Sequence, residues 1–150
     1  MKHVIDIMTI EPACCTPDTR LPEVAKLMLK NDCGEIPVID NEETRKPVGV
    51  ITDRDIVCRS IAVDNNPLEI PVSEVMSSPA LTVPFNMRTE ECCHFMAKHG
   101  VRRILVVDKD GQLYGIVSQA DLARFLTVEQ KVEFFERISS PREPSTRNAA

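Results

Sequence analysis

The chain lacks long apolar runs, an excess of positive charge, and the short motifs that identify the common enzyme folds. No stretch approaches the roughly 18 consecutive apolar residues that a membrane-spanning helix needs. The net charge is −5 and the pI is about 5.2, whereas proteins that bind a nucleic-acid backbone usually carry a basic face. No P-loop is present, and no nucleophile stands at a recognisable spacing from a base and an orienting group. We therefore expect no membrane or nucleic-acid partner and no enzymatic activity.

The sequence also lacks a hydrophobic signal segment at its start and the Cys-x-x-Cys spacing of structural zinc sites. We expect a cytoplasmic protein, in which the six cysteines are reduced thiols and not a disulfide framework. The adjacent pairs Cys14-Cys15 and Cys92-Cys93 align mostly with small or apolar residues in the repeat described below. This favours buried packing over metal binding. A thiol or metal sensor is kept as a minor alternative.

What the sequence does contain is an internal repeat. Met8 and Met76 begin two stretches that align without a gap at a constant offset of 68 (76 − 8). The offset then drops to 66 (115 − 49), and residues 49–55 match residues 115–121. A unit of about 60 residues is too long for a helical solenoid repeat and too short for most independent domains. We expect the two copies to pack together as one module.

Each copy has the apolar patterning of a strand, a helix, two further strands and a second helix. In the first copy we expect strands at 13–15, 36–39 and 48–51, a helix that Asp18 or Thr19 caps and that continues through Met28, and a helix at 53–61. In the second copy we expect strands at 81–83, 104–107 and 114–117, a helix through 92–96, and a helix at 119–126. Pro22 fits the first turn of its helix, where the missing N–H costs little.

The expected domain organisation follows from these elements. The first repeat spans 1–62, a linker 63–71, the second repeat 72–127 and a C-terminal helix 128–138, and the polar residues 139–150 are expected to be disordered. The C-terminal helix is expected to carry one apolar side, formed by Val128, Val132, Phe135 and Ile138. Such a side can pack on its own module or contact a second copy of the chain.

The motifs of the repeat resemble those of the cystathionine-β-synthase-type (CBS) domain, in the tandem pair known as a Bateman module. The matching segments are Asp6-Ile-Met8-Thr9 with Glu74-Val-Met76-Ser77, Ile36-Pro-Val-Ile-Asp40 with Ile104-Leu-Val-Val-Asp108, and a Gly-apolar-apolar-Thr/Ser-x-x-Asp end in both copies. The resemblance covers residues 4–127, and Leu105 departs from it because the family usually has proline there.

The resemblance implies an α/β fold of two βαββα repeats packed about a pseudo-twofold axis, often paired into a homodimer. It also implies clefts that bind an adenosyl ligand, either AMP, ADP, ATP or S-adenosylmethionine. The expected function is therefore regulation by such a ligand, with no required cofactor and with an unknown partner protein that receives the signal. The alternative is a scaffold that dimerises and binds a partner whether or not a ligand is present.

The two Gly-apolar-apolar-Thr/Ser-x-x-Asp ends carry the ribose contacts that the resemblance implies. A hydroxyl followed three residues later by a carboxylate is also the pattern of a helix cap, so a purely structural role is the competing interpretation. An ionised aspartate only accepts hydrogen bonds, so it can bind both hydroxyls of a ribose diol. We expect Asp55 and Asp121 to contact ribose, with Thr52 and Ser118 in support.

A bound phosphate needs cations, and the two copies differ in what they supply. Arg102 and Arg103 precede the central strand of the second copy, where the family often places a phosphate-facing basic group. The matching residues of the first copy are Gly34 and Glu35, and Arg54 is a weaker candidate. We therefore expect one cleft to hold phosphate better. The adenine is expected near the edges of largely buried residues, namely Cys14, Cys15, Ile36, Pro37, Leu81, Val101 and Ile104.

Overall fold

The computed structural model describes residues 1–141, so most of the tail expected to be disordered lies outside the described residues. The fold is mixed α/β, and the chain divides into two compact units. The repeat-1 unit consists of residues 12–80, and the repeat-2 unit consists of residues 1–11 together with the described residues from 81 onward. No helix among the described residues is long and apolar enough to cross a bilayer.

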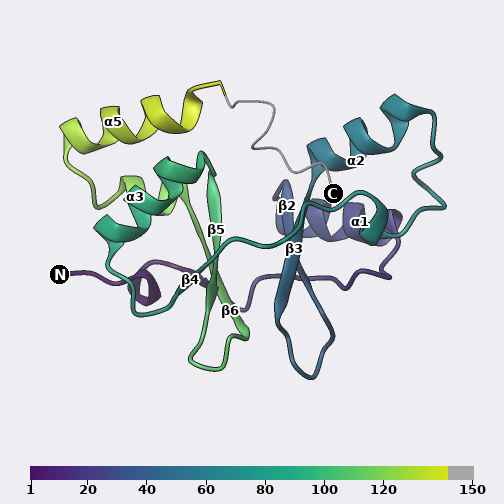
Figure 1. The fold of residues 1–150 in the computed structure, drawn as a ribbon, viewed down its shortest axis with the longest axis horizontal. Coiled ribbons are helices and arrows are strands. Elements are labelled where there is room, and N and C mark those ends of the chain that lie inside the picture. The colour runs from purple at the N-terminus through teal and green to yellow at the C-terminus, as the bar shows by residue number, and fades with distance from the viewer. Residues whose placement is uncertain (142–150) are drawn as a thin grey trace. The chain divides into compact units, whose positions relative to one another are not determined.

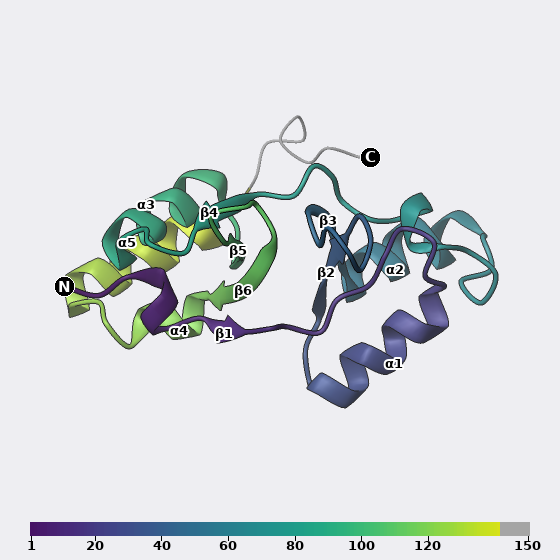
Figure 2. The same cartoon turned by 90° about the horizontal axis from the view of Figure 1, so that it is seen from below.

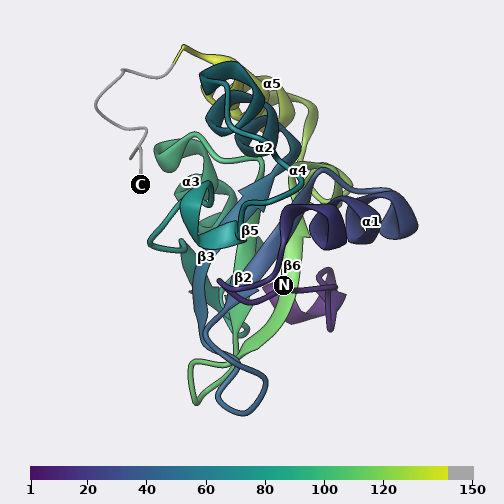
Figure 3. The same cartoon turned by 90° about the vertical axis from the view of Figure 1, so that its right-hand side faces the viewer.

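The repeat-1 unit contains one antiparallel hairpin and two helices (Figures 1 and 3). Its elements are α1 (Leu21–Asn31), β2 (Glu35–Ile39), β3 (Pro47–Thr52) and α2 (Asp53–Arg59), with 3-10 turns at Ile61–Val63 and Val72–Glu74. α1 contributes Leu21, Val24 and Met28 to the core, at the spacing of one helical face. The expected elements 36–39, 48–51 and 53–61 are present within one or two residues.

The repeat-2 unit is built on a four-stranded sheet in the order β1-β6-β5-β4. Its elements are β1 (Thr9–Ile10), β4 (Thr82–Pro84), α3 (Thr89–His99), β5 (Arg103–Val107), β6 (Leu113–Ser118), α4 (Gln119–Ala123) and α5 (Val128–Ser139), with a 3-10 turn at Val4–Asp6. β4 runs parallel to β5, and the other pairs are antiparallel. Figure 2 shows β1, in purple, beside β6.

Two details of the first copy differ from the sequence expectation. The strand expected at 13–15 is reduced to a single bridge between Cys15 and Val38. The cap position of α1 is Arg20, whose side chain makes no capping bond. Instead, the Leu21 amide donates to the Ile70 carbonyl at 3.1 Å. A tertiary contact with the expected linker therefore satisfies the helix end that a local side chain was expected to cap.

The start of each repeat packs in the unit of the other repeat. The Val4 and Ile5 amides donate to the carbonyls of Met87 (2.8 Å) and Phe85 (3.0 Å), and β1 pairs with β6. In the repeat-1 unit, the Val72 amide donates to a carbonyl that precedes α1, that of Thr19, at 2.8 Å. Both Val4 and Val72 are fully buried. Each compact unit therefore contains most of one sequence repeat together with the first segment of the other repeat.

Two glycines make room for the exchanged segments. A Cβ on Gly49 would lie 2.5 Å from the Ser77 carbonyl oxygen, and a Cβ on Gly115 would lie 2.8 Å from the Thr9 carbonyl oxygen. Both oxygens belong to hydrogen-bonded backbone, because the Ser77 oxygen accepts from the Val50 amide at 2.9 Å and β1 is paired with β6. Close backbone approach therefore explains the glycine that begins each Gly-apolar-apolar-Thr/Ser motif.

The apolar side expected for the C-terminal helix is only partly correct. Ile138 is buried, but its partner in the core is Phe134, which is 2% exposed, and not Phe135. Val128 and Val132 are exposed. Phe134 and Ile138, four residues apart, pack in the core on the side where α5 meets α3, which leaves Val128, Val132 and Phe135 on a different side of the helix.

Because each repeat contributes a segment to the other unit, two matched substitutions should destabilise different units. We expect Val4→Ala and Val72→Ala each to lower the free energy of unfolding by roughly 1–3 kcal/mol, because each removes two buried methyl groups. Hydrogen exchange measured by mass spectrometry should rise in β4–β6 for Val4→Ala and in β2–β3 for Val72→Ala. Faster hydrogen exchange in β2–β3 for Val4→Ala, or in β4–β6 for Val72→Ala, would contradict the segment exchange between the repeats.

Candidate functional site

Both candidate ribose aspartates sit at a junction between a strand and a helix, where they form capping boxes. In the repeat-1 unit, the Thr52 hydroxyl accepts from the Asp55 amide at 3.0 Å and the Asp55 carboxylate accepts from the Thr52 amide at 3.0 Å. In the repeat-2 unit, Ser118 and Asp121 make the same two bonds at 3.2 and 2.8 Å. The capping interpretation of both motifs is therefore confirmed, and a ribose role has to use what the caps leave free.

The two carboxylates differ in their remaining hydrogen-bonding capacity. Oδ1 of Asp55 lies 3.8 Å from Nε of Arg59 and 3.5 Å from the Ser77 hydroxyl. Asp121 receives the Ser118 hydroxyl at 2.8 Å through Oδ2, the same oxygen that accepts the Ser118 amide. Within residues 1–141, Oδ1 of Asp121 has no hydrogen-bond or ion-pair partner. One acceptor oxygen of Asp121 is therefore left without a partner among the described residues, whereas the Asp55 carboxylate also contacts Ser77 and Arg59.

The charge difference expected between the two copies is present at these junctions. The Gln119 amide, at the start of α4, donates to the Arg102 carbonyl at 2.9 Å, and Arg103 is the sheet partner of Ser118. Both arginines are exposed, and neither forms an ion pair within the described part of the chain. Arg102 and Arg103 thus bring two unpaired cations to the β6–α4 junction, which also carries Asp121.

The matching positions of the repeat-1 unit, Gly34 and Glu35, carry no cation. The Asp53 amide donates to the Gly34 carbonyl at 3.0 Å, and Glu35 pairs with Thr52. A Cβ on Gly34 would lie 2.8 Å from Oδ2 of Asp53. This junction therefore carries a glycine and the two carboxylates of Glu35 and Asp53, and neither arginine has a counterpart at the aligned positions. Arg54, at the start of α2, is exposed and has no ion pair within residues 1–141.

Most of the apolar residues expected near an adenine are core residues. The side chains of Cys15, Ile36, Pro37 and Ile104 are buried. Cys14 and Val101 are half-buried, and Leu81 is exposed. The fourteen candidate residues divide evenly, with Cys14, Cys15, Ile36, Pro37, Thr52, Arg54 and Asp55 in the repeat-1 unit and the other seven in the repeat-2 unit.

The buried thiols are in environments that keep them protonated. Burial, with a smaller effect from the neighbouring cysteine, raises the pKa of both Cys15 and Cys92 to about 12. Burial together with Glu133 and Glu90 raises the pKa of Cys93 to about 11. Burial also raises the pKa of Cys14, although Arg45 opposes the shift. Thiolate is the form that binds metals and attacks disulfides, so these values favour a packing role.

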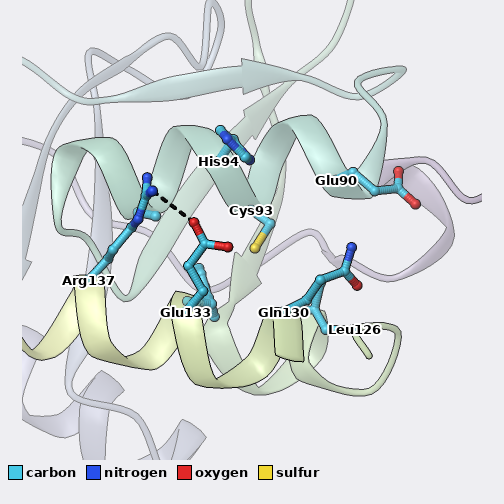
Figure 4. Close-up of a pocket in the computed structure, with 9 residues that line it drawn as sticks. Glu90, Cys93, His94, Leu126, Gln130, Glu133 and Arg137 are labelled. Atoms are coloured by element: carbon cyan, nitrogen blue, oxygen red, sulfur yellow. Dashed lines mark ion pairs between the residues drawn. The ribbon is translucent and has the colours of Figure 1, made fainter. Parts of the chain in front are cut away.

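A cavity of about 130 Å³ between α3 and α5 was not foreseen from the sequence. It is lined by Glu90, Cys93, His94, Ala97, Leu126, Gln130, Glu133, Phe134 and Arg137. In Figure 4 the Cys93 thiol points from α3 toward α5, whereas His94 points away from α5. Glu133 is paired with Arg137 at 2.8 Å. Across the described residues, no three His, Cys, Asp or Glu side chains are arranged to hold a metal ion.

This chain belongs to the CBS-domain family, because the family's sequence pattern matches residues 4–61 and 72–128. Hypoxic response protein 1 of Mycobacterium tuberculosis is 32% identical over 94% of this chain and 96% of its own length. A crystal structure of hypoxic response protein I with two coordinated zinc ions has a TM-score of 0.74 and 29% identity, covering 84% of this chain and all of that one. The expected tandem CBS pair is therefore confirmed.

Two further solved structures of CBS-domain proteins contain adenosyl molecules. CBSX2 of Arabidopsis thaliana, in complex with AMP, has a TM-score of 0.70 and 27% identity, covering 83% of this chain and 96% of that one. The CBS pair of MJ0100, in complex with 5′-methylthioadenosine and S-adenosyl-L-methionine, has a TM-score of 0.72 and 25% identity, covering 83% and 95%.

The burial of the cysteines predicts a graded reactivity toward a thiol reagent. Cys58 is exposed and should react first in the native protein, whereas Cys15 and Cys92 should react only when the chain unfolds, because they are buried and protonated. The measurement is the rate of colour release from Ellman's reagent at pH 8, with Cys58→Ser as the control that loses the fast phase. Peptide mapping that finds Cys15 or Cys92 in that phase would contradict the packing role.

Proposed function

We propose that this chain is a regulatory module that binds a phosphate-bearing adenosyl ligand at the β6–α4 junction of the repeat-2 unit. The observation that carries the proposal is the combination of an unoccupied Asp121 oxygen with the two unpaired arginines, Arg102 and Arg103, at one junction. AMP in CBSX2 and S-adenosylmethionine in MJ0100 support the ligand class, because both proteins share this fold. The module has no catalytic role in this proposal.

The chemistry of the junction fits a nucleotide. Oδ2 of Asp121 stays bonded to Ser118, which fixes the orientation of the carboxylate, while Oδ1 accepts a hydrogen bond from a ribose hydroxyl. The guanidinium groups of Arg102 and Arg103 donate charge-assisted hydrogen bonds to phosphate oxygens. A nucleotide such as AMP, ADP or ATP uses both features, whereas S-adenosylmethionine has no phosphate for the arginines.

The β3–α2 junction of the repeat-1 unit is the weaker of the two seats. Ser77 and Arg59 already contact the Asp55 carboxylate, and Glu35 and Asp53 add negative charge beside it. Ligand binding at this junction has to displace these contacts, and phosphate meets like charge. Arg54, at the start of α2, is a cation near this junction that has no ion pair within residues 1–141. We therefore propose that the β6–α4 junction is the main ligand site of the chain, and that a partner protein responds when this site is occupied.

A thermal-shift screen with AMP, ADP, ATP, S-adenosylmethionine and adenosine tests the ligand class. At a ligand concentration of about 100 Kd, binding to the native state adds about 2.7 kcal/mol of stability. We expect a nucleotide to raise the Tm of the wild type, Asp121→Asn to lose most of that shift and Asp55→Asn to keep most of it. The ligand-induced shift is compared and not the Tm alone, because both substitutions also weaken a cap.

The matched control is Gln130→Ala, which weakens the capping box of α5 at a distance from both junctions in the sequence. It should lower the Tm and leave the ligand-induced shift unchanged. Equal ligand-induced shifts in the wild type and Asp121→Asn would refute the assigned ribose contact. If no adenosyl compound stabilises the wild type, the ligand-independent scaffold becomes the better function.

Removal of the arginines separates phosphate recognition from nucleoside recognition. We expect Arg102→Ala and Arg103→Ala each to weaken AMP binding on the order of tenfold, because each removes one charge-assisted contact. Adenosine binding should be unchanged. The measurement is isothermal titration calorimetry, and the control is Arg54→Ala, which removes an exposed arginine from the other unit. An equal loss for AMP and adenosine would show that the arginines act on the fold and not on phosphate.

A further inference from the structure

α5 presents an exposed apolar stripe on the side that is turned away from its own core. Val128, Val132 and Phe135 are 71%, 54% and 37% exposed, whereas Phe134 and Ile138 are buried. The match to the CBS-domain pattern ends at Val128, the first residue of α5, so the rest of the helix lies beyond it. The stripe is therefore an addition to the family's module and is not needed to complete the core of the repeat-2 unit.

The stripe has the spacing of a coiled-coil seam. Val128, Val132, Phe135 and Ser139 follow one another at intervals of four, three and four residues, which are the intervals between successive d and a positions of a heptad. In this register, Lys131 occupies position g, directly before Val132, and Glu136 occupies position e, directly after Phe135. Opposite charges therefore border the stripe on its two sides.

Neither of these flanking charges is used among the residues that the structure describes. Within residues 1–141, the Lys131 ammonium and the Glu136 carboxylate have no ion-pair partner, whereas Glu133 and Arg137, on another side of the helix, are paired with each other at 2.8 Å. Glu136 is exposed and Lys131 is half-buried. Glu129, which also occupies position e, is exposed and has no ion pair within these residues either. The seam therefore has an unused lysine on one side and unused glutamates on the other, which fits a partner that offers the complementary charges.

A second copy of the same helix has that arrangement, and the charges determine its direction. In parallel coiled-coil pairs, position g of one helix meets position e of the other five residues later, and Lys131 and Glu136 are five residues apart. A parallel pair therefore forms two Lys131–Glu136 ion pairs. An antiparallel pair brings position e against position e, which places Glu129 against Glu136 of the second copy.

We propose that α5 is a self-association surface on which a second copy of this chain docks with its α5 parallel to the first. Val132 and Phe135 lie at the seam, and the two Lys131–Glu136 pairs close its sides. This association goes beyond the proposed ligand binding and does not depend on it. Because the helix has twelve residues, we expect a reversible, concentration-dependent dimer.

The test is sedimentation-equilibrium ultracentrifugation of the full chain across a range of concentrations without ligand. We expect Lys131→Glu and Glu136→Lys each to weaken the dimer on the order of tenfold, since each turns two attractive pairs into two repulsive ones. The double variant should associate like the wild type, because its pairs are attractive again. Lys98→Glu, on the exposed surface of α3, changes the net charge by the same amount as Lys131→Glu and should have no effect.

A second set of variants locates the seam. Val132→Glu should abolish the dimer without unfolding the chain, because that side chain is exposed in one copy, and circular dichroism at low concentration checks the fold. A wild type that is monomeric at every concentration would overturn the proposal. So would a dimer that survives Val132→Glu, or a double charge variant that is no better than the single ones. Retention of a different protein by the stripe while the wild type stays monomeric counts against it as well.

Discussion

The rest of the structure depends on the exchange of one segment between the two repeats. Residues 1–11 complete the sheet and core of the repeat-2 unit, and residues 70–77 complete the core of the repeat-1 unit and make a single bridge to β3. Val4 and Val72 are each fully buried by elements of the other copy. Neither sequence repeat therefore forms a closed core from its own residues, which explains why the chain carries two copies and not one. The chain passes between the units twice, at 11–12 and at 80–81.

The same exchange explains residues that look like local signals. Gly49 and Gly115 are required because the backbone of the exchanged segment crosses within contact distance of them. The α1 terminus needs no side-chain cap, because the Leu21 amide is satisfied by the Ile70 carbonyl. In each case a position that can be read as helix or turn chemistry is set by a distant partner, which is 28 residues away for Gly49 (77 − 49), 106 for Gly115 (115 − 9) and 49 for Leu21 (70 − 21).

The two strand-to-helix junctions show how one motif serves two purposes. Its capping bonds hold each carboxylate in a fixed orientation, and the bonds that remain decide what the carboxylate can do next. At Asp55 the remaining capacity is turned toward Ser77 and Arg59, whereas at Asp121 one oxygen is left without a partner among residues 1–141. The neighbouring residues reinforce this difference, with Gly34 closely packed in one unit and Arg102 exposed in the other. The same junction can therefore have different roles in the two repeats.

The sequence by itself determined the repeat, the order of strands and helices, and the residues that form the two capping boxes. These features depend on apolar periodicity and on contacts three or four residues apart, which are local. It also determined the contrast between Gly34 and Arg102, because aligned positions can be compared without coordinates.

Only the tertiary structure decided which copy buries Val4 and Val72, because both copies offer equivalent strands and the sequence pattern is the same for either choice. It also decided that Phe134 and not Phe135 faces the core, since adjacent aromatic residues differ by about 100° around a helix and only the docking of α5 on α3 selects between them. Finally, it decided which oxygen of Asp121 stays available, because that depends on how the Ser118 hydroxyl and amide divide their hydrogen bonds in three dimensions.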